Sequence, residues 1–168
     1  TNTNTNTNYR GLAFIVQSSV EQLLAHPSVR VHEGSLAWWA PRELNRHADA
    51  AADAAALEAD HTTWSDYDLA FVCWSEVSEV SISFDGASWA NTAVAGSAVV
   101  AWAKISASWQ AIIIRTFSTP SANNHWAELV AATVAVALAT DVASWIGRSK
   151  EVKQVCCECG CSTTVVFV

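Results

Sequence analysis

Three stretches of the chain predict helices from the pattern of their apolar residues. Between residues 9 and 26 they recur every three or four positions, which predicts an amphipathic helix that ends before Pro27. A strand over residues 12–16, with a helix that starts at Ser18, is the alternative interpretation. Residues 43–60 are rich in Ala and predict a second helix, with Pro41 near its first turn.

The third stretch, residues 126–146, is almost wholly apolar and has the length of a membrane span. It contains Glu128 and Asp141. A charged side chain at the centre of a bilayer costs about 2.5–3.5 kcal/mol on insertion scales. We therefore expect a helix that is buried against a sheet, and no contact with a membrane.

Strand patterns follow one another in the middle of the chain. Residues 82–100 predict two strands around a turn, and residues 110–117 predict a third. Residues 29–39 predict a hairpin or a bent strand. Residues 61–67 are polar and turn-like, so a linker is expected at 61–70. The alternating Thr-Asn tract at residues 1–8 has no side chain that could build a core and predicts a flexible tail.

The composition favours a single globular domain with weak affinity for nucleic acid. A chain of 168 residues buries about two-thirds of its unfolded surface, and a hydrophobic content of 51% supplies the side chains for that core. The net charge is −7, and the nine Lys and Arg residues are scattered along the sequence. Because neutralisation of phosphates supplies most non-specific affinity, this balance argues against strong binding of nucleic acid.

Three motifs resemble parts of the ribonuclease H family. Residues 82–100 resemble its opening hairpin, in which the first strand delivers an aspartate, here Asp85, and the second strand begins at an Ala-Gly pair. Residues 123–128, Asn-Asn-His-Trp-Ala-Glu, resemble the start of the helix that carries a catalytic glutamate, with one extra residue before Glu128. The run from Pro41 to Asp49 is similar to the family's last helix, which brings in a further aspartate.

The resemblance implies an α/β fold: a ribonuclease H-like mixed sheet of five strands, or a reduced one, flanked by helices, with its segments in circularly permuted order. Residues 9–60 are similar to the C-terminal half of the family, yet they precede residues 71–150, which are similar to the N-terminal half. Permutation of one domain and a cut across two tandem domains both explain this order. The two halves would then meet within one chain or by swapping between the chains of a dimer.

The resemblance also implies a retroelement-derived endonuclease that hydrolyses the RNA strand of RNA–DNA hybrids. Asp85, Glu128 and Asp49 would be its catalytic residues and would bind Mg²⁺ or Mn²⁺, because hard cations prefer carboxylate oxygens. In the family a fourth carboxylate ends a strand after the glutamate helix. Asp141 is a poor substitute, since it would lie about 20 Å from Glu128 along a continuous helix. A catalytically inactive relic or interaction module with the same fold is the alternative.

The five cysteines are Cys73 and a cluster of four within residues 156–161. One short cluster is not a disulfide framework, and it lacks the second pair of ligands that a structural zinc site takes from a separate segment. Residues 151–168 are therefore expected to form a Cys-rich tail without a clear place in the fold. The Thr-Asn start has no charged-then-apolar leader, so we expect an intracellular location, cytoplasmic or nuclear.

Overall fold

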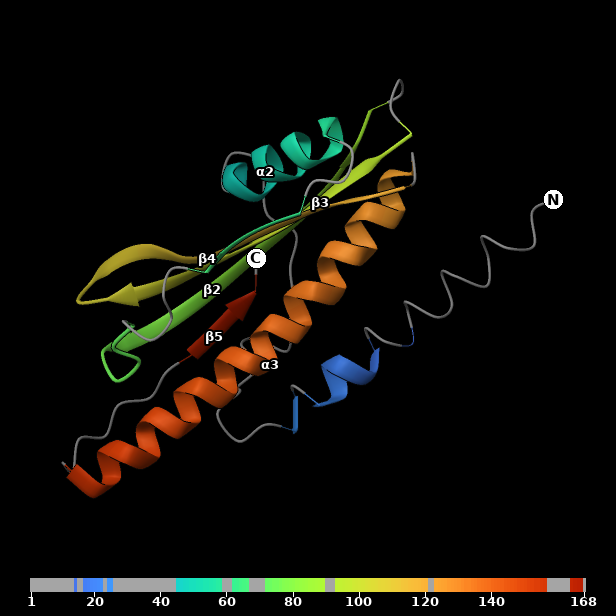
Figure 1. Ribbon diagram of the computed structural model, residues 1–168. Helices are drawn as coiled ribbons and strands as arrows, with labels where there is room; N and C mark the ends of the chain where they lie inside the picture. The colour runs from blue at the N-terminus through green and yellow to red at the C-terminus, as the bar shows by residue number, and fades with distance from the viewer. Residues whose placement is uncertain are drawn as a thin grey trace.

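The computed structural model describes residues 14, 17–22, 24–25, 45–58, 62–66, 72–89, 93–120, 123–156 and 164–167. Within them a five-stranded sheet lies between two helices (Figure 1). The strand order is β1-β4-β3-β2-β5, and all neighbours are antiparallel except β2 and β5, which run parallel. Along the chain the elements are α2 (Arg46–Leu57), β1 (Thr62–Asp66), β2 (Val77–Ser88), β3 (Ala95–Ile105), β4 (Ser108–Thr119), α3 (Asn124–Cys156) and β5 (Thr164–Phe167). The predicted α/β class is thereby confirmed.

The central strands β2, β3 and β4 form a meander that the sequence predicted. Side chains alternate between the two faces of a strand, so Val80 and Ile82 of β2 face one side while Ser81 and Ser83 face the other. The hairpin expected at residues 82–100 is present, and β3 begins at the expected Ala-Gly pair. The third strand, expected at residues 110–117, extends further at both ends.

A two-residue turn joins β3 to β4 in a conformation that few residues adopt. Ser106 and Ala107 have φ values of 49° and 70°, and the ladder closes with Ile105 opposite Ser108. Positive φ at both central positions gives the twist that two-residue hairpins need, and Asn or Gly usually occupies them. The turn therefore holds two L-residues in a strained left-handed conformation.

Two glycines show that α2 and α3 lie on opposite faces of the sheet. A Cβ atom on Gly96 of β3 would meet the backbone of α2, whereas one on Gly86 of β2 would meet the backbone of α3. Gly96 pairs with Ala87, and the neighbours Gly86 and Ala87 point to opposite faces of β2. Figure 1 shows the same arrangement, with α2 on one side of the sheet and α3 along the other.

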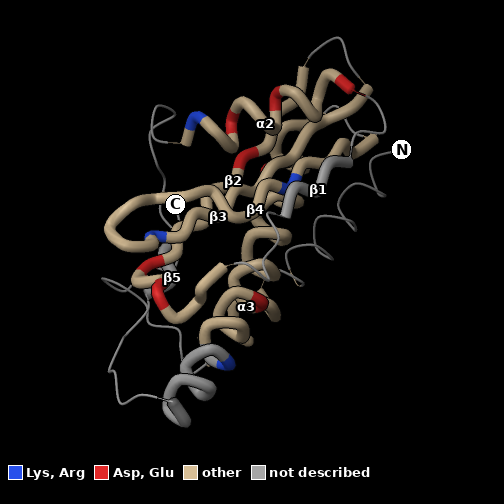
Figure 2. Tube along the Cα trace, turned by 60° about the vertical axis from the view of Figure 1, so that its left-hand side comes forward, with Lys and Arg blue, Asp and Glu red and all other residues tan. Residues whose placement is uncertain are grey.

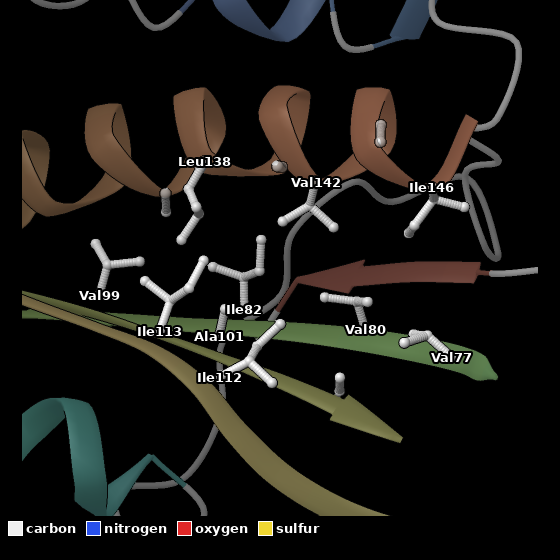
Figure 3. Packing of buried hydrophobic residues seen from close by; sticks show 14 of the residues in the cluster. Val77, Val80, Ile82, Val99, Ala101, Ile112, Ile113, Leu138, Val142 and Ile146 are labelled. Atoms are coloured by element: carbon white, nitrogen blue, oxygen red, sulfur yellow. The ribbon is translucent and has the colours of Figure 1, made fainter. Parts of the chain in front are cut away.

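The main core fills the space between α3 and the sheet. Figure 3 shows side chains from α3 pointing toward side chains of β2, β3 and β4. The largest that are fully buried there are Ile82, Ile113, Leu138, Ile146, Val77, Val80, Val99 and Val142. Each contributes about 1.5–3 kcal/mol by leaving water. Packing of the apolar helix against a sheet is confirmed. By length and composition alone, Asn124–Ile146 would also qualify as a membrane span.

The structure confirms one prediction next to α2, the helix, and contradicts another, the turn that follows it. The helix expected over residues 43–60 begins at Arg46 and ends at Leu57, because Asn45 (φ −95°, ψ 9°) and Glu58 (φ −112°, ψ 110°) have non-helical backbones. The turn and linker expected at residues 61–70 contain the strand β1, which pairs with the outer edge of β4. Thr and Trp favour strands, and an edge strand tolerates a polar sequence because one side of it meets water.

The tail expected at residues 151–168 is partly ordered structure. The helix α3 continues to Cys156, and β5 pairs in parallel with β2 over the register from Glu79↔Thr164 to Ile82↔Phe167. The β5 sequence Thr-Val-Val-Phe consists of β-branched and aromatic residues, which suit a strand. Residues 157–163 lie outside the described part of the chain, as do the predicted hairpin at 29–39 and the predicted tail at 1–8.

Near the N-terminus, residues 17–22 are helical, and so are Phe14, Leu24 and Ala25. This agrees with the helix predicted over residues 9–26. The helical backbone of Phe14 contradicts the alternative interpretation, a strand over residues 12–16. Val20 packs against the core beneath α3.

Candidate functional site

Asp85 lies in the last third of β2, on the face that α2 covers. It pairs with Ala98, which lies two residues after Gly96 on β3 and therefore has the same orientation toward α2. The Oδ1 atom of Asp85 accepts a hydrogen bond from the backbone N–H of Gly86 (2.8 Å). The Oδ2 atom accepts one from the side-chain amide Nδ2 of Asn45 (3.2 Å). Both carboxylate oxygens are therefore held by nitrogen donors.

Asn45 connects Asp85 to the start of α2. Besides Asp85, its Nδ2 also donates to the carbonyl oxygen of Phe84 (3.1 Å). The main-chain carbonyl oxygen of Asn45 accepts a hydrogen bond from the backbone N–H of Asp49 (3.1 Å), which lies in the first turn of α2. The candidate residues Asp49 and Asp85 thus share Asn45 as a bonded neighbour, although they lie on different elements.

Glu128 lies on α3, one residue further into the helix than the family pattern implies. The helix starts directly after Asn123. The Oδ1 atom of Asn123 accepts a hydrogen bond from the N–H of His125 (3.0 Å), and its main-chain carbonyl accepts one from the N–H of Trp126 (3.1 Å). The first turn of α3 contains no acidic residue, so Glu128 belongs to the second turn. The extra residue in the sequence therefore lengthens the helix ahead of Glu128.

The Glu128 carboxylate interacts with residues of its own helix. Its Oε1 accepts a hydrogen bond from Nδ2 of Asn124 (2.7 Å), and its Oε2 lies 3.6 Å from Nδ1 of His125. The side chain of Glu128 is 49% exposed. Its backbone, by contrast, is in direct contact with the sheet, because Gly86 packs against the Glu128 nitrogen. Ser97 fixes the same turn by donating its hydroxyl to the carbonyl of Ala127 (2.8 Å).

The elements that carry the three predicted carboxylates meet at one part of β2, but the carboxylates do not form a single ligand group. Asp85 faces α2, whereas the neighbouring Gly86 faces α3 and Glu128, so the sheet separates the two sides. Within the described residues, no group of three or more His, Cys, Asp or Glu side chains could hold a metal ion. A ready divalent-metal site is therefore not assembled from Asp85, Glu128 and Asp49 with their side chains in these positions.

Other carboxylates do not complete the set. Asp141 is exposed on the same continuous helix as Glu128, three and a half turns along, which excludes it from a site at Asp85. The sequence indicated no strand after the helix that carries Glu128, but in the structure β5 follows that helix. Its ladder with β2 ends at Ile82, however, and β5 contains no acidic residue.

Asn45 is the residue that sequence reasoning missed. It was part of the motif that resembles the family's last helix, but no role was assigned to it. One signal could have indicated it, because Asn is favoured immediately before a helix and here it precedes Asp49 by four residues. The bond to Asp85 joins residues forty positions apart, and no local pattern predicts such a contact.

Charges in the described residues form no basic surface. Figure 2 shows acidic positions along α2, and Lys and Arg positions that are separated from one another. Lys104 of β3 lies 3.6 Å from the carboxylate of Glu79 and 5.8 Å from the centre of the Trp109 ring. His47 on α2 makes an edge contact with Trp102, at 4.9 Å between ring centres.

Comparison of the chain with models of protein families, with curated proteins and with solved structures finds no match. The resemblance to the ribonuclease H family therefore rests on the motifs in the sequence alone.

Proposed function

We propose that the chain has a ribonuclease H-like fold whose segments run in circularly permuted order. The hairpin that carries Asp85, the third strand and the helix that carries Glu128 follow one another as the resemblance implies. The parallel strand β5 comes after the glutamate helix. The helix with Asp49 packs on the same hairpin, as closure of a permuted domain requires.

The function that this arrangement supports best is metal-dependent hydrolysis of the RNA strand of RNA–DNA hybrids. One observation carries the proposal: the starts of both helices reach the same point of β2, through Asn45 on one face and through the backbone of Glu128 on the other. Asp85, Glu128 and Asp49 would hold Mg²⁺ or Mn²⁺, which would activate water and stabilise the leaving oxygen. The exposed Glu128 side chain would have to leave Asn124 and His125, and it would have to reach Asp85 from the other face of the sheet.

A second candidate is a non-catalytic module with the same fold. The described residues contain no group of three metal-ligating side chains, and β5 brings no carboxylate to the side of Asp85. Three carboxylates would also bind a second metal ion poorly. A net charge of −7 would further weaken the hold on a hybrid.

Cleavage of an end-labelled RNA–DNA hybrid with Mg²⁺ or Mn²⁺ distinguishes the two. We expect the native chain to cut the RNA strand only with metal, and Asp85→Asn to lower the rate at least about 100-fold, because a metal ligand supplies several kcal/mol to the transition state. Asp141→Asn is the matched control, since it removes an exposed carboxylate of α3 outside the site. No cleavage by a native chain with a native circular dichroism spectrum would favour the non-catalytic module.

A further inference from the structure

The outer edge of β4 is only partly covered by β1. The strand β1 pairs with Ile113 to Phe117, whereas β4 already begins at Ser108. Among the described elements, no strand pairs with the outer edge of residues 108–112, which are called the β4 edge segment below. Ser108, Trp109 and Gln110 are exposed. Because hydrogen bonds alternate along an antiparallel strand, every second residue of this segment directs its N–H and C=O groups away from β3.

The β4 edge segment lacks the features by which proteins usually keep an edge strand from pairing with other chains. Its sequence, Ser-Trp-Gln-Ala-Ile, contains no charged residue and no proline. Trp and Ile also favour the extended conformation of a strand. The neighbouring edge strand β1, by contrast, ends with the charged Asp66. The β4 edge segment is therefore suited to pairing with a further strand.

Trp109 gives this segment an aromatic side chain that is exposed and already oriented. The residue is 43% exposed, and the Lys104 ammonium lies 5.8 Å from the centre of its ring. Lys104 is opposite Trp109 in the β3–β4 ladder and lies 3.6 Å from the Glu79 carboxylate. A side chain that is held before association loses less conformational entropy on binding. Large aromatic residues are also typical anchors of protein interfaces.

The charges at this edge favour an uncharged partner. The segment itself is uncharged, and the ion pair of Lys104 with Glu79 on the adjoining strands adds no net charge. The net charge of −7 belongs to the whole chain. Its effect on a second copy is weak, because ions screen exposed charges beyond about 8 Å at physiological ionic strength. A second copy of the same uncharged segment therefore fits this edge better than an acidic or a basic strand does.

A second copy fits the β4 edge segment in one antiparallel register. With Gln110 opposite Gln110 of the second copy, all five residues of each segment are paired. Trp109 then lies opposite Ala111 of the other copy, so that on both sides a large ring covers a small side chain. The register can change only in steps of two residues, because bonding groups must face bonding groups. Such a shift pairs fewer residues or meets β1, which occupies the edge from Ile113 onward.

We propose that the chain forms a symmetric dimer in which the β4 edge segments of two copies pair antiparallel about Gln110. The pairing would join two five-stranded sheets into one. It is independent of the proposed nuclease function. A stable interface buries about 1,600 Å², whereas each buried Trp supplies roughly 150–250 Å². The contact is therefore small, and the dimer should form reversibly as the protein concentration rises.

Charge at Gln110 tests the register, because the proposed symmetry places this residue opposite itself. In sedimentation equilibrium with a thiol reductant, the mass of the native chain should rise above the monomer mass of 18.0 kDa with concentration. Gln110→Lys and Gln110→Glu should each weaken self-association at least about fivefold, because like charges then lie directly opposite each other. An equimolar mixture of the two variants should recover the dimer, because opposite charges then meet.

Two more variants separate this contact from other modes of association. Trp109→Ala should weaken the dimer at least about tenfold, since each interface loses two rings. Ala137→Lys, at an exposed position of α3, is the matched control and should leave the dimer unchanged. The midpoint of urea unfolding, measured for each variant, shows that the fold is kept.

Three results would overturn the proposal. The first is a native chain that stays monomeric up to about 1 mM. The second is a native dimer that persists in Gln110→Lys and Gln110→Glu, as a dimer formed by exchange of segments between chains would. The third is an equimolar mixture that associates no better than either variant alone, because the two copies then do not meet at Gln110.

Discussion

A single added methyl group at Gly86 should lower the stability of the fold considerably. Gly86→Ala adds a single Cβ atom on the α3 face of β2. That atom would overlap with backbone atoms of Ala127 and Glu128, in particular with the Glu128 nitrogen. Backbone atoms cannot rotate away as a side chain can, so the second turn of α3 has to move off the sheet.

The loss of stability can be estimated from three terms. Overpacking of a tightly packed site costs about 1–3 kcal/mol. Displacement of α3 also breaks the bond from the Ser97 hydroxyl to the Ala127 carbonyl, which is worth about 0.5–1.5 kcal/mol. The lower entropy of the unfolded chain with Ala in place of Gly returns about 0.4–1 kcal/mol. The net expectation for Gly86→Ala is therefore a loss of about 2 kcal/mol.

Urea unfolding followed by Trp fluorescence measures this loss, since the chain contains nine Trp residues. Ser97→Ala alone should cost about 1 kcal/mol. Once Gly86→Ala has displaced the helix, the further change Ser97→Ala should have almost no effect. A loss below about 0.5 kcal/mol for Gly86→Ala, or full additivity of the two changes, would refute the close approach of α3 to β2.

Two more changes test the other side of the sheet and the hairpin. Gly96→Ala places a Cβ atom against the Ala52 carbonyl and the Ala56 nitrogen of α2, so it should lower the free energy of unfolding by about 1–3 kcal/mol in the same urea assay; a neutral result would contradict the packing of α2 on β3. Ala107→Gly relieves a φ of 70° in the β3–β4 turn and should raise stability by about 1 kcal/mol, whereas a loss of stability would show that the turn is not left-handed there.

The sequence was most informative where one segment contains its own pairing partner. The strands β2 and β3 follow one another along the chain, and β2 alternates polar with apolar residues, so the two strands and the start of β3 at Ala95 and Gly96 followed from local pattern. The strands β1 and β5 were missed for the opposite reason. Each is short, and each becomes a strand only because a partner far along the chain, β4 or β2, offers it an edge.

Some residues of the candidate site could likewise be predicted from the sequence and others could not. Asp85, Asp49 and Glu128 were identified from motifs that are continuous in the sequence. The side chain that joins two of these motifs, Asn45, was not identified, because its role depends on how α2 packs on β2. The separation of Asp85 from Glu128 by the sheet likewise follows from the register of Gly86 and Gly96, which a sequence alone does not fix.

The pairing of β5 with β2 has a consequence for synthesis on the ribosome. Of the described elements β5 emerges last, after the meander and the whole of α3. Until then the edge of β2 that β5 will cover presents unpaired N–H and C=O groups over Glu79 to Ile82. Such an edge is a template for strands of other chains. Nascent copies on one polysome are therefore exposed to strand exchange with their neighbours until the closing strand has been made.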